Sequence, residues 1–172
     1  MNRKNDEAFR ELYNRYKNPI FSYIKRYLYY SSDDIISDLT NDVFIRAYMN
    51  LPHLKKVKYF KSWLYRIAHN LCIDYIRTKK AVHLDMDHLP DNTVDKRVDL
   101  ENDYVENEKI ETMLNIIDNF DYEIKALIIL KFFQGLTFKE ISEILQIPVR
   151  SLQYKLRNAL TELEFKLKKE GL

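Results

Sequence analysis

The sequence predicts an all-α protein made of two small helical domains that an acidic, flexible linker joins. Only two glycines and four prolines occur among its 172 residues, which leaves long helices as the natural structure. Apolar residues recur at spacings of three and four in two separate blocks, as one face of a helix requires. A polar stretch with little apolar periodicity lies between the blocks. We therefore expect domains at residues 1–80 and 109–172, with a linker at residues 81–108.

Charge is distributed unevenly over these three parts. Residues 1–80 carry 16 Lys and Arg against 8 Asp and Glu, whereas residues 81–108 carry two basic and nine acidic residues. Residues 109–172 are nearly balanced, with ten basic and nine acidic residues. A basic block indicates a polyanionic partner, although an ordinary solvated surface carries similar charge. The acidic segment has two interpretations: it imitates nucleic acid or covers the basic block, or it is a solvated tether.

The composition also bears on where the protein works. Cys72 is the lone cysteine, so no internal disulfide can form, which fits a reducing cytoplasm. The first twenty residues are polar and charged, unlike a signal peptide. The longest apolar run, residues 126–130, is far too short to span a bilayer. We therefore expect a soluble, cytoplasmic protein.

The first two helices are predicted from apolar stripes and from their flanking residues. Pro19 falls inside the first stripe and either kinks that helix or begins a second one. Asp33 and Asp34 follow two serines, a cluster that favours a helix N-terminus. A second stripe runs from there until Pro52 ends it. The members of the first stripe are Phe9, Leu12, Tyr13, Tyr16, Ile20, Ile24 and Tyr27.

A third helix is predicted over residues 62–80, after a lysine-rich loop or short turn at residues 53–61 that contains no acidic residue. Cys72 falls on the apolar face, so we expect a small buried hydrophobe rather than a reactive thiol. The expected core residues are Trp63, Leu64, Ile67, Ala68, Leu71, Cys72 and Tyr75. A second face of this helix carries Arg66, Asn70, Asp74 and Arg77, where Asp74 is within pairing range of Arg77.

The C-terminal block has the spacing of a helix-turn-helix. Thr137 and Glu140 form a capping box that starts a short helix, residues 146–148 break it, and Val149 begins a longer one. DNA readers place the first residues of the second helix against base edges in the major groove. A plain helical bundle with a polar surface helix is the alternative. The exposed face is expected to carry Arg150, Ser151, Gln153, Tyr154, Lys155 and Arg157.

Four stretches of the chain resemble motifs of the extracytoplasmic-function sigma factors of the sigma-70 family, in the same order. Residues 63–77, with the pattern WLYRIA-x-N-x-x-x-D-x-x-R, are similar to the promoter-melting helix. Residues 38–48 resemble the polymerase-binding helix, and residues 9–16 resemble the opening of the first domain. Residues 130–141 resemble the start of the second DNA-binding domain. The resemblance covers almost the whole chain except the linker.

The resemblance implies a sigma factor, a non-enzymatic subunit that binds core RNA polymerase and directs promoter-specific transcription initiation. The helix that docks on the coiled coil of the polymerase beta-prime subunit would use Asp38, Asn41, Asp42 and Arg46. The −10 element, with one base flipped out, would meet Leu54, Lys55, Lys56, Lys58, Arg66, Asn70 and Arg77. The −35 element would be read as duplex DNA by Arg150, Ser151, Gln153, Tyr154, Lys155 and Arg157.

The resemblance also implies partners and a role for the linker. The expected partners are promoter DNA, the beta-prime coiled coil and beta flap of core polymerase, and an anti-sigma factor. No cofactor, metal or small-molecule substrate is expected. The two promoter elements lie about 17 base pairs apart, roughly 55–60 Å along the duplex. A flexible linker of 28 residues has a mean span of about 30 Å, so it bridges the elements only when polymerase holds both domains.

The chain departs from the family's pattern at four positions. The family usually has Gln at the position of Asn41 and an aromatic residue at that of Leu54. Gly is common at position 146, so Gln146 stands in a turn that favours a positive φ. Tyr154 occupies a position where a small Ser is usual, which changes the expected −35 preference.

Three rival classes fit the sequence less well. An enzyme would need a catalytic or cofactor-binding site. Because the chain has only two glycines, it has no glycine-rich loop that could bind phosphate. His83, Asp85, Asp87 and His88 could bind a metal, but a polar linker is the commoner explanation of such a cluster. A conventional helix-turn-helix regulator would bind duplex DNA alone, often as a dimer, and would not need the motif at residues 63–77. A protein adaptor would show no salt-dependent DNA binding.

Overall fold

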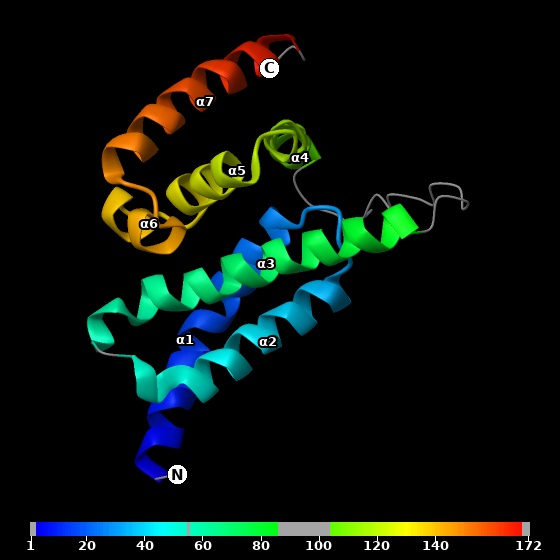
Figure 1. The fold of residues 1–172 in the computed structure, drawn as a ribbon. Helices are drawn as coiled ribbons and strands as arrows, with labels where there is room; N and C mark the ends of the chain where they lie inside the picture. The colour runs from blue at the N-terminus through cyan, green and yellow to red at the C-terminus, as the bar shows by residue number, and fades with distance from the viewer. Residues whose placement is uncertain (1–2, 55, 86–103, 170–172) are drawn as a thin grey trace.

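Every regular element that the computed structural model describes, in residues 3–54, 56–85 and 104–169, is a helix (Figure 1). The prediction of an all-α fold is therefore confirmed. The short elements η1 and η2 are 3₁₀ turns, and η3 is a π-helical turn that continues α5. The elements are α1 (Arg3–Tyr27), α2 (Asp33–Asn50), η1 (Leu51–His53), η2 (Val57–Tyr59), α3 (Phe60–Asp85), α4 (Tyr104–Asp118), α5 (Tyr122–Ile128), η3 (Ile129–Phe133), α6 (Phe138–Leu145) and α7 (Val149–Lys169).

The N-terminal block is a packed bundle of α1, α2 and α3. Pro19 lies inside α1 without ending it, so the stripe predicted from the sequence belongs to one helix. Ile20, Ile24 and Tyr27 of that stripe are fully buried, whereas its first members are half-buried. The Tyr13 ring meets the Phe44 ring of α2 edge to face, with 4.7 Å between the centroids. The Phe9 ring makes similar edge-to-face contacts with Phe44 and Tyr48, so aromatic side chains join the first half of α1 to the second half of α2.

The predicted helix boundaries hold in some places and shift in others. α2 begins at Asp33 as predicted, and the Ser32 hydroxyl caps it by accepting a hydrogen bond from the Ile35 amide. α3 starts two residues before residue 62 and continues to Asp85, five residues past the predicted end. No glycine or proline lies between residues 60 and 85, so no local signal stops the helix there. α4 likewise begins at Tyr104, inside the segment predicted as linker.

The C-terminal block contains α4 to α7, of which α6 and α7 are the short and the long helix predicted on either side of the break at residues 146–148. Its core is formed by Ile117, Leu127, Leu130, Ile141 and Leu152, all nearly inaccessible to solvent. Within the described ranges, no helix is both long and apolar enough to cross a membrane.

The two blocks pack against each other, which the sequence did not predict. α6 lies across the first half of α3, and η3 contacts α1 (Figure 1). Tyr65 of α3 is buried here, although the apolar pattern places it outside the N-terminal core. Its hydroxyl donates a hydrogen bond of 2.8 Å to the Gln134 side chain. One continuous hydrophobic core therefore runs through both blocks.

A buried polar cluster lies where α1 meets α3. His69 Nδ1 lies 3.0 Å from the Tyr23 hydroxyl, and the His69 ring packs edge to face on Tyr27. Burial lowers the pKa of His69 from 6.5 to about 4, although Glu123 opposes this change slightly. Cys72 is buried and burial raises the pKa of its thiol, which confirms the prediction of a small hydrophobe.

We expect acid to destabilise the chain through His69. Because its pKa is lower in the folded state, folding favours the neutral ring, and this stability is complete above about pH 6.5 and lost as the pH falls toward 4. The free energy of unfolding should decrease by about 2 kcal/mol from this group between pH 7 and pH 5. Urea unfolding at pH 7 and at pH 5 measures this decrease in the free energy of unfolding. The His69→Gln variant keeps a hydrogen-bond acceptor for Tyr23 and should lose less stability than the unaltered chain between pH 7 and pH 5. An equal loss in both proteins would contradict the assignment to His69.

Candidate nucleic-acid interface

A cavity of about 260 Å³ opens between the end of α2 and the first half of α3. Pro52 contributes to ending α2, and η1 then turns the chain so that its side chains face α3. Trp63, Ile67 and Asn70 recur at spacings of four and three, so they share one face of α3. The cavity is lined by Arg46, Asn50, His53, Trp63, Ile67 and Asn70.

The cavity combines an apolar wall with polar groups that can bind a flat, polar ligand. Trp63 and Ile67 are half-buried, and the Trp63 ring is fixed by contact with Phe60, whose centroid is 5.8 Å away. Asn50 donates a hydrogen bond of 2.8 Å to the Arg46 carbonyl oxygen, which holds its side chain at the rim. Asn70 is exposed and its amide can both donate and accept hydrogen bonds. These features suit an unstacked nucleotide base.

The residues predicted for the −10 element lie in different surroundings. Asn70 lines the cavity, whereas Leu54 is half-buried and packs against the core. Lys56 and Lys58 are exposed beside the cavity-forming turn, and Lys55 lies outside the described residues.

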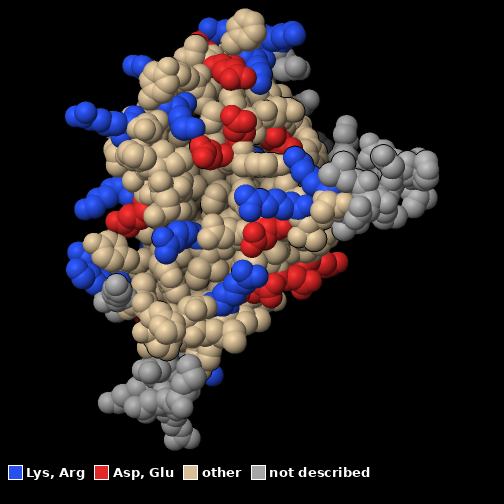
Figure 2. All heavy atoms as spheres, viewed as in Figure 1, with Lys and Arg blue, Asp and Glu red and all other residues tan. Residues whose placement is uncertain are grey.

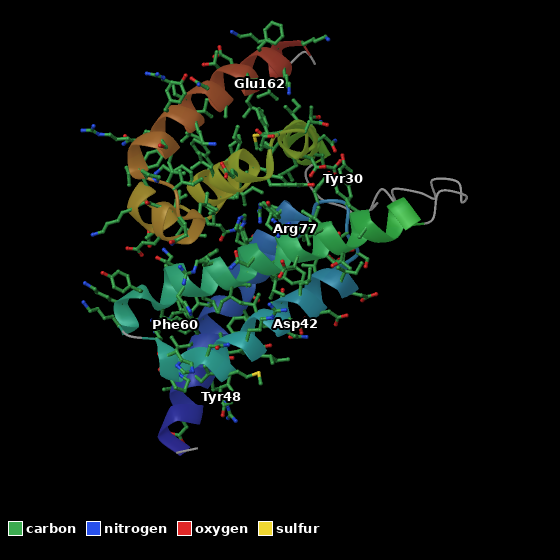
Figure 3. The ribbon with its side chains drawn as sticks, viewed as in Figure 1. Tyr30, Asp42, Tyr48, Phe60, Arg77 and Glu162 are labelled. Atoms are coloured by element: carbon green, nitrogen blue, oxygen red, sulfur yellow. The ribbon has the colours of Figure 1, made fainter. Side chains whose placement is uncertain are left out.

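Arg66 and Arg77 share α3 with Asn70 but do not line the cavity. Arg66 is half-buried and Arg77 exposed. Arg77 lies about 10 Å further along the helix axis than Asn70, in the half remote from Phe60 (Figure 3).

Sequence reasoning missed four of the six residues that line the cavity. Asn50 and His53 lie at the end of a helix and in a turn, where no periodicity singles them out. Trp63 and Ile67 were predicted as core, and an apolar pattern cannot distinguish a buried face from a cavity wall. Arg46 was predicted as polymerase-binding and also borders the cavity. Asn50 lies one helical turn after Arg46, and this spacing was the sequence signal that could have placed Asn50 beside Arg46.

The side chains predicted to bind polymerase form an exposed strip on α2. Asp42 marks this strip in Figure 3. Two large apolar residues, Ile45 and Met49, are 56% and 71% exposed on the same helix and were not predicted. Exposed apolar residues beside charges are typical of a protein-binding surface. The predicted residues, all exposed, are Asp38, Asn41, Asp42 and Arg46.

α6 and α7 form the predicted helix-turn-helix. Thr137 and Glu140 make the predicted capping box, with the Thr137 amide donating to Glu140 at 2.8 Å and the Glu140 amide donating to Thr137 at 3.2 Å. Burial favours the neutral form of Glu140, but hydrogen bonds from Thr137 and Lys61 outweigh it and lower its pKa. Gln146 has φ of 59°, the left-handed conformation predicted for this turn.

The predicted reading face of α7 is largely free of the rest of the protein. Tyr154 is 60% exposed, and the Arg157 guanidinium lies over its ring, 5.6 Å from the centroid. Lys155 differs, because its Nζ pairs with Glu123 of α5 at 2.8 Å. The exposed members are Arg150, Ser151, Gln153, Tyr154 and Arg157.

Basic side chains gather on the edge of the molecule that carries the two candidate DNA-binding surfaces, the cavity and the exposed face of α7. Figure 2 shows Lys and Arg projecting from this edge over the start of α7, over α6 and over the turn that leads into α3. Lys58, Lys139 and Arg150 are exposed members of these three elements. Polyanion binding therefore has a structural basis in both blocks.

The described part of the chain shows no metal centre. In residues 3–54, 56–85 and 104–169, no three or more His, Cys, Asp or Glu side chains are grouped to hold an ion. The side chains of His83, Asp85, Asp87 and His88, considered above as possible ligands, lie outside the described residues.

Comparisons with known proteins agree with this arrangement. Residues 12–82 match the family model of Sigma-70 region 2, and residues 125–163 match that of Sigma-70, region 4. An ECF RNA polymerase sigma-E factor of Haemophilus influenzae is 27% identical over 94% of this chain and 88% of its own length. The ECF RNA polymerase sigma factor SigW of Bacillus subtilis is 29% identical over 94% of this chain and 90% of its own.

Solved structures support the fold. The sigma factor RpoE of Bartonella quintana, solved in complex with the anti-sigma factor NepR, is similar with a TM-score of 0.77 at 15% identity, covering 94% of this chain and 98% of that one. CnrH, solved with the cytosolic domain of CnrY, gives a TM-score of 0.70 at 18% identity, covering 95% and 90%. The chain belongs to the extracytoplasmic-function sigma factors of the sigma-70 family, which direct promoter-specific transcription initiation.

Proposed function

We propose that this chain docks on core RNA polymerase through α2, holds an unstacked −10 base in the cavity between α2 and α3, and reads the −35 element as duplex with α7. The observation that carries this proposal is the cavity, which lies within the stretch that matches Sigma-70 region 2. It brings an aromatic wall, amide groups and cations together at one end of a basic block.

The cavity offers what a flipped base requires. Taking a base out of the stack costs a few kcal/mol, and stacking on an aromatic side chain returns about 1–3 kcal/mol per base. Trp63 supplies that surface, while Asn50 and Asn70 supply hydrogen-bonding groups for the base edge. Lys56 and Lys58 are exposed on the segment between η1 and α3 and would neutralise the adjacent phosphates. We assign Arg46 to this cavity as well as to the polymerase contact. The predicted roles of Leu54, Lys55, Arg66 and Arg77 remain proposals.

The strip on α2 suits a helical partner such as the beta-prime coiled coil. Ile45 and Met49 would form the apolar centre of the contact, and Asp38, Asn41 and Asp42 would form its polar part. Asn41 has a shorter side chain than the Gln usual in the family, so we expect it to contribute less to the contact with polymerase.

The first turns of α7 suit base reading in the major groove. Arg150 and Gln153 can pair bidentately with guanine and adenine edges, and Ser151 and Arg157 can bind phosphates or edges. Tyr154 adds bulk at the centre of this face. Lys155 reaches DNA only by leaving Glu123, and exposed ion pairs of this kind are weak enough to exchange.

We also propose the wider setting of the protein. Domains at residues 1–80 and 109–172, joined by a linker at 81–108, would act on the two promoter elements. The protein would work in the cytoplasm without catalytic activity, cofactor or small-molecule substrate, and the beta flap would hold the second domain. An anti-sigma factor is a further proposed partner, since RpoE and CnrH were solved with NepR and CnrY.

Run-off transcription tests the proposed function as a whole. Core polymerase and a genomic template library, with this protein added, should yield discrete new start sites that share two sequence elements about 17 base pairs apart. Core polymerase alone is the control. No new start sites, together with duplex binding by the protein alone, would favour a conventional helix-turn-helix regulator.

Replacing α7 residues should separate −35 reading from polymerase binding. Arg150→Ala or Gln153→Ala should lower discrimination at one −35 position by about five- to 150-fold, because a bidentate base contact contributes about 1–3 kcal/mol. Competition binding of the holoenzyme to promoter variants measures this loss. Lys168→Ala, in the last turn of the same helix, is the matched control. An equal loss of core binding in the Arg150 or Gln153 variant would contradict the assignment.

Asn70→Ala should impair promoter opening more than recruitment. Losing one hydrogen bond to the flipped base, worth about 1 kcal/mol, should reduce open complexes about fivefold while promoter occupancy changes little. Permanganate reactivity of the −10 thymines reports opening, and footprinting reports occupancy. Asn119→Ala, an exposed asparagine of the C-terminal block, is the control. Normal thymine reactivity in the Asn70 variant would rule out its role.

A further inference from the structure

We propose that Tyr154 and Arg157 of α7 act as one base-reading unit, in which Arg157 pairs with a guanine and Tyr154 covers the methyl group of a thymine on a neighbouring base pair. The inference rests on the proposed function and deepens it, because it names two bases that α7 would select in the −35 element. Tyr154 has two tasks in this unit: it contacts one base directly, and it positions the Arg157 side chain for the other.

The two side chains are in contact in the structure without DNA. The Arg157 guanidinium lies over the Tyr154 ring, with 5.6 Å between the guanidinium carbon and the ring centroid. Both side chains are exposed, and α7 lies at the outer edge of the C-terminal block (Figure 1). Arg150, Tyr154 and Arg157 recur at intervals of four and three, so they share one face of the helix. The unit is therefore already assembled on the face whose first turn would enter the major groove.

The positive charge of Arg157 is available to a ligand. Within the described residues, no carboxylate forms an ion pair with its guanidinium. Residues 149–161 contain no Asp or Glu, so no acidic side chain lies within a turn of Arg157 on α7. The acidic residues further along the helix pair with Lys166 and Lys168, each at 2.7 Å. An anionic or acceptor-rich ligand would therefore meet an unpaired guanidinium at this position.

A stacked guanidinium suits a guanine edge. When a guanidinium lies on an aromatic face, its N–H groups remain in its own plane, and its edge stays free to donate two parallel hydrogen bonds. Guanine presents two acceptors in the major groove, O6 and N7, whereas adenine presents one acceptor beside a donor. Because Arg157 shares its face with Arg150, we assign it a base edge. A phosphate contact is the alternative, and it would carry no base preference.

The Tyr154 ring supplies an apolar surface next to that edge. Thymine alone presents a methyl group in the major groove, and an aromatic side chain can pack against it. Base pairs are stacked about 3.4 Å apart, so two side chains 5.6 Å apart reach bases that are close along the duplex. Guanine and thymine do not form a Watson–Crick pair, so the two bases belong to neighbouring base pairs.

Binding of the holoenzyme to promoters with a randomised −35 element tests the assignment. The unaltered chain should select a guanine with a thymine on a neighbouring base pair. Arg157→Ala should lower discrimination for guanine by about five- to 150-fold. Tyr154→Ser should lower it by about two- to fivefold, because an exposed cation–aromatic contact is lost, and Tyr154→Phe should restore it. Phe165→Ser, which removes a 71% exposed ring from the same helix, is the matched control.

Modified bases at the selected positions test the individual contacts. 7-Deazaguanine lacks the N7 acceptor and should weaken binding of the unaltered holoenzyme by about fivefold or more. Uracil lacks the thymine methyl group and should weaken binding by about two- to fourfold. In the Arg157→Ala variant 7-deazaguanine should have no further effect, and in the Tyr154→Ser variant uracil should have none.

The outcomes separate this inference from the function on which it rests. If Arg157→Ala weakens binding equally for all sequences and reduces its salt dependence, Arg157 binds a phosphate and the assignment is overturned. A preference for other bases, or a thymine–uracil difference that survives in Tyr154→Ser, would also overturn it. A holoenzyme without any base preference in the −35 element would instead contradict the proposed reading of that element by α7.

Discussion

The rest of the structure depends on the position of α3, because three faces of this helix meet three different parts of the protein. Leu64, Ala68 and Cys72 form its buried apolar face and fix it against α1 and α2. A second face, with Trp63 and Asn70, borders the cavity. A third face contacts α6. Because a helix carries all three faces rigidly, any change in how α3 sits in the N-terminal core changes the cavity and the contact between blocks together.

The cavity and the strip proposed to dock on polymerase share the end of α2. Arg46 belongs to the exposed strip and also lines the cavity, and Asn50 is bonded to the Arg46 carbonyl oxygen. The proposed polymerase contact and the proposed base-binding cavity are therefore adjacent on one rigid helix end. This arrangement lets binding energy from the protein partner fix the geometry of the base-binding wall, since a site on regular elements is held more accurately than one on a loop.

The turns that bound α6 depend on local backbone chemistry. Gly135 has φ of 63° and lets the chain leave η3, and Thr137 and Glu140 then start α6. Gln146 adopts the left-handed conformation without being glycine, and its side-chain amide donates a hydrogen bond of 2.7 Å to the Glu143 carbonyl oxygen. That bond partly offsets the strain of a side chain at positive φ. The family's usual turn is thereby kept despite the departure.

The sequence by itself determined where most helices lie, the N-caps of α2 and α6 and the exposed face of α7, because these follow from periodicity and from residues close in the chain. It determined the family as well, through four motifs in order. Only the tertiary structure decided which half-buried residues line a cavity and why Tyr65 is buried. Those outcomes depend on contacts such as Tyr65 with Gln134, between residues distant in the chain, and helical periodicity carries no information about which distant segment covers a given face.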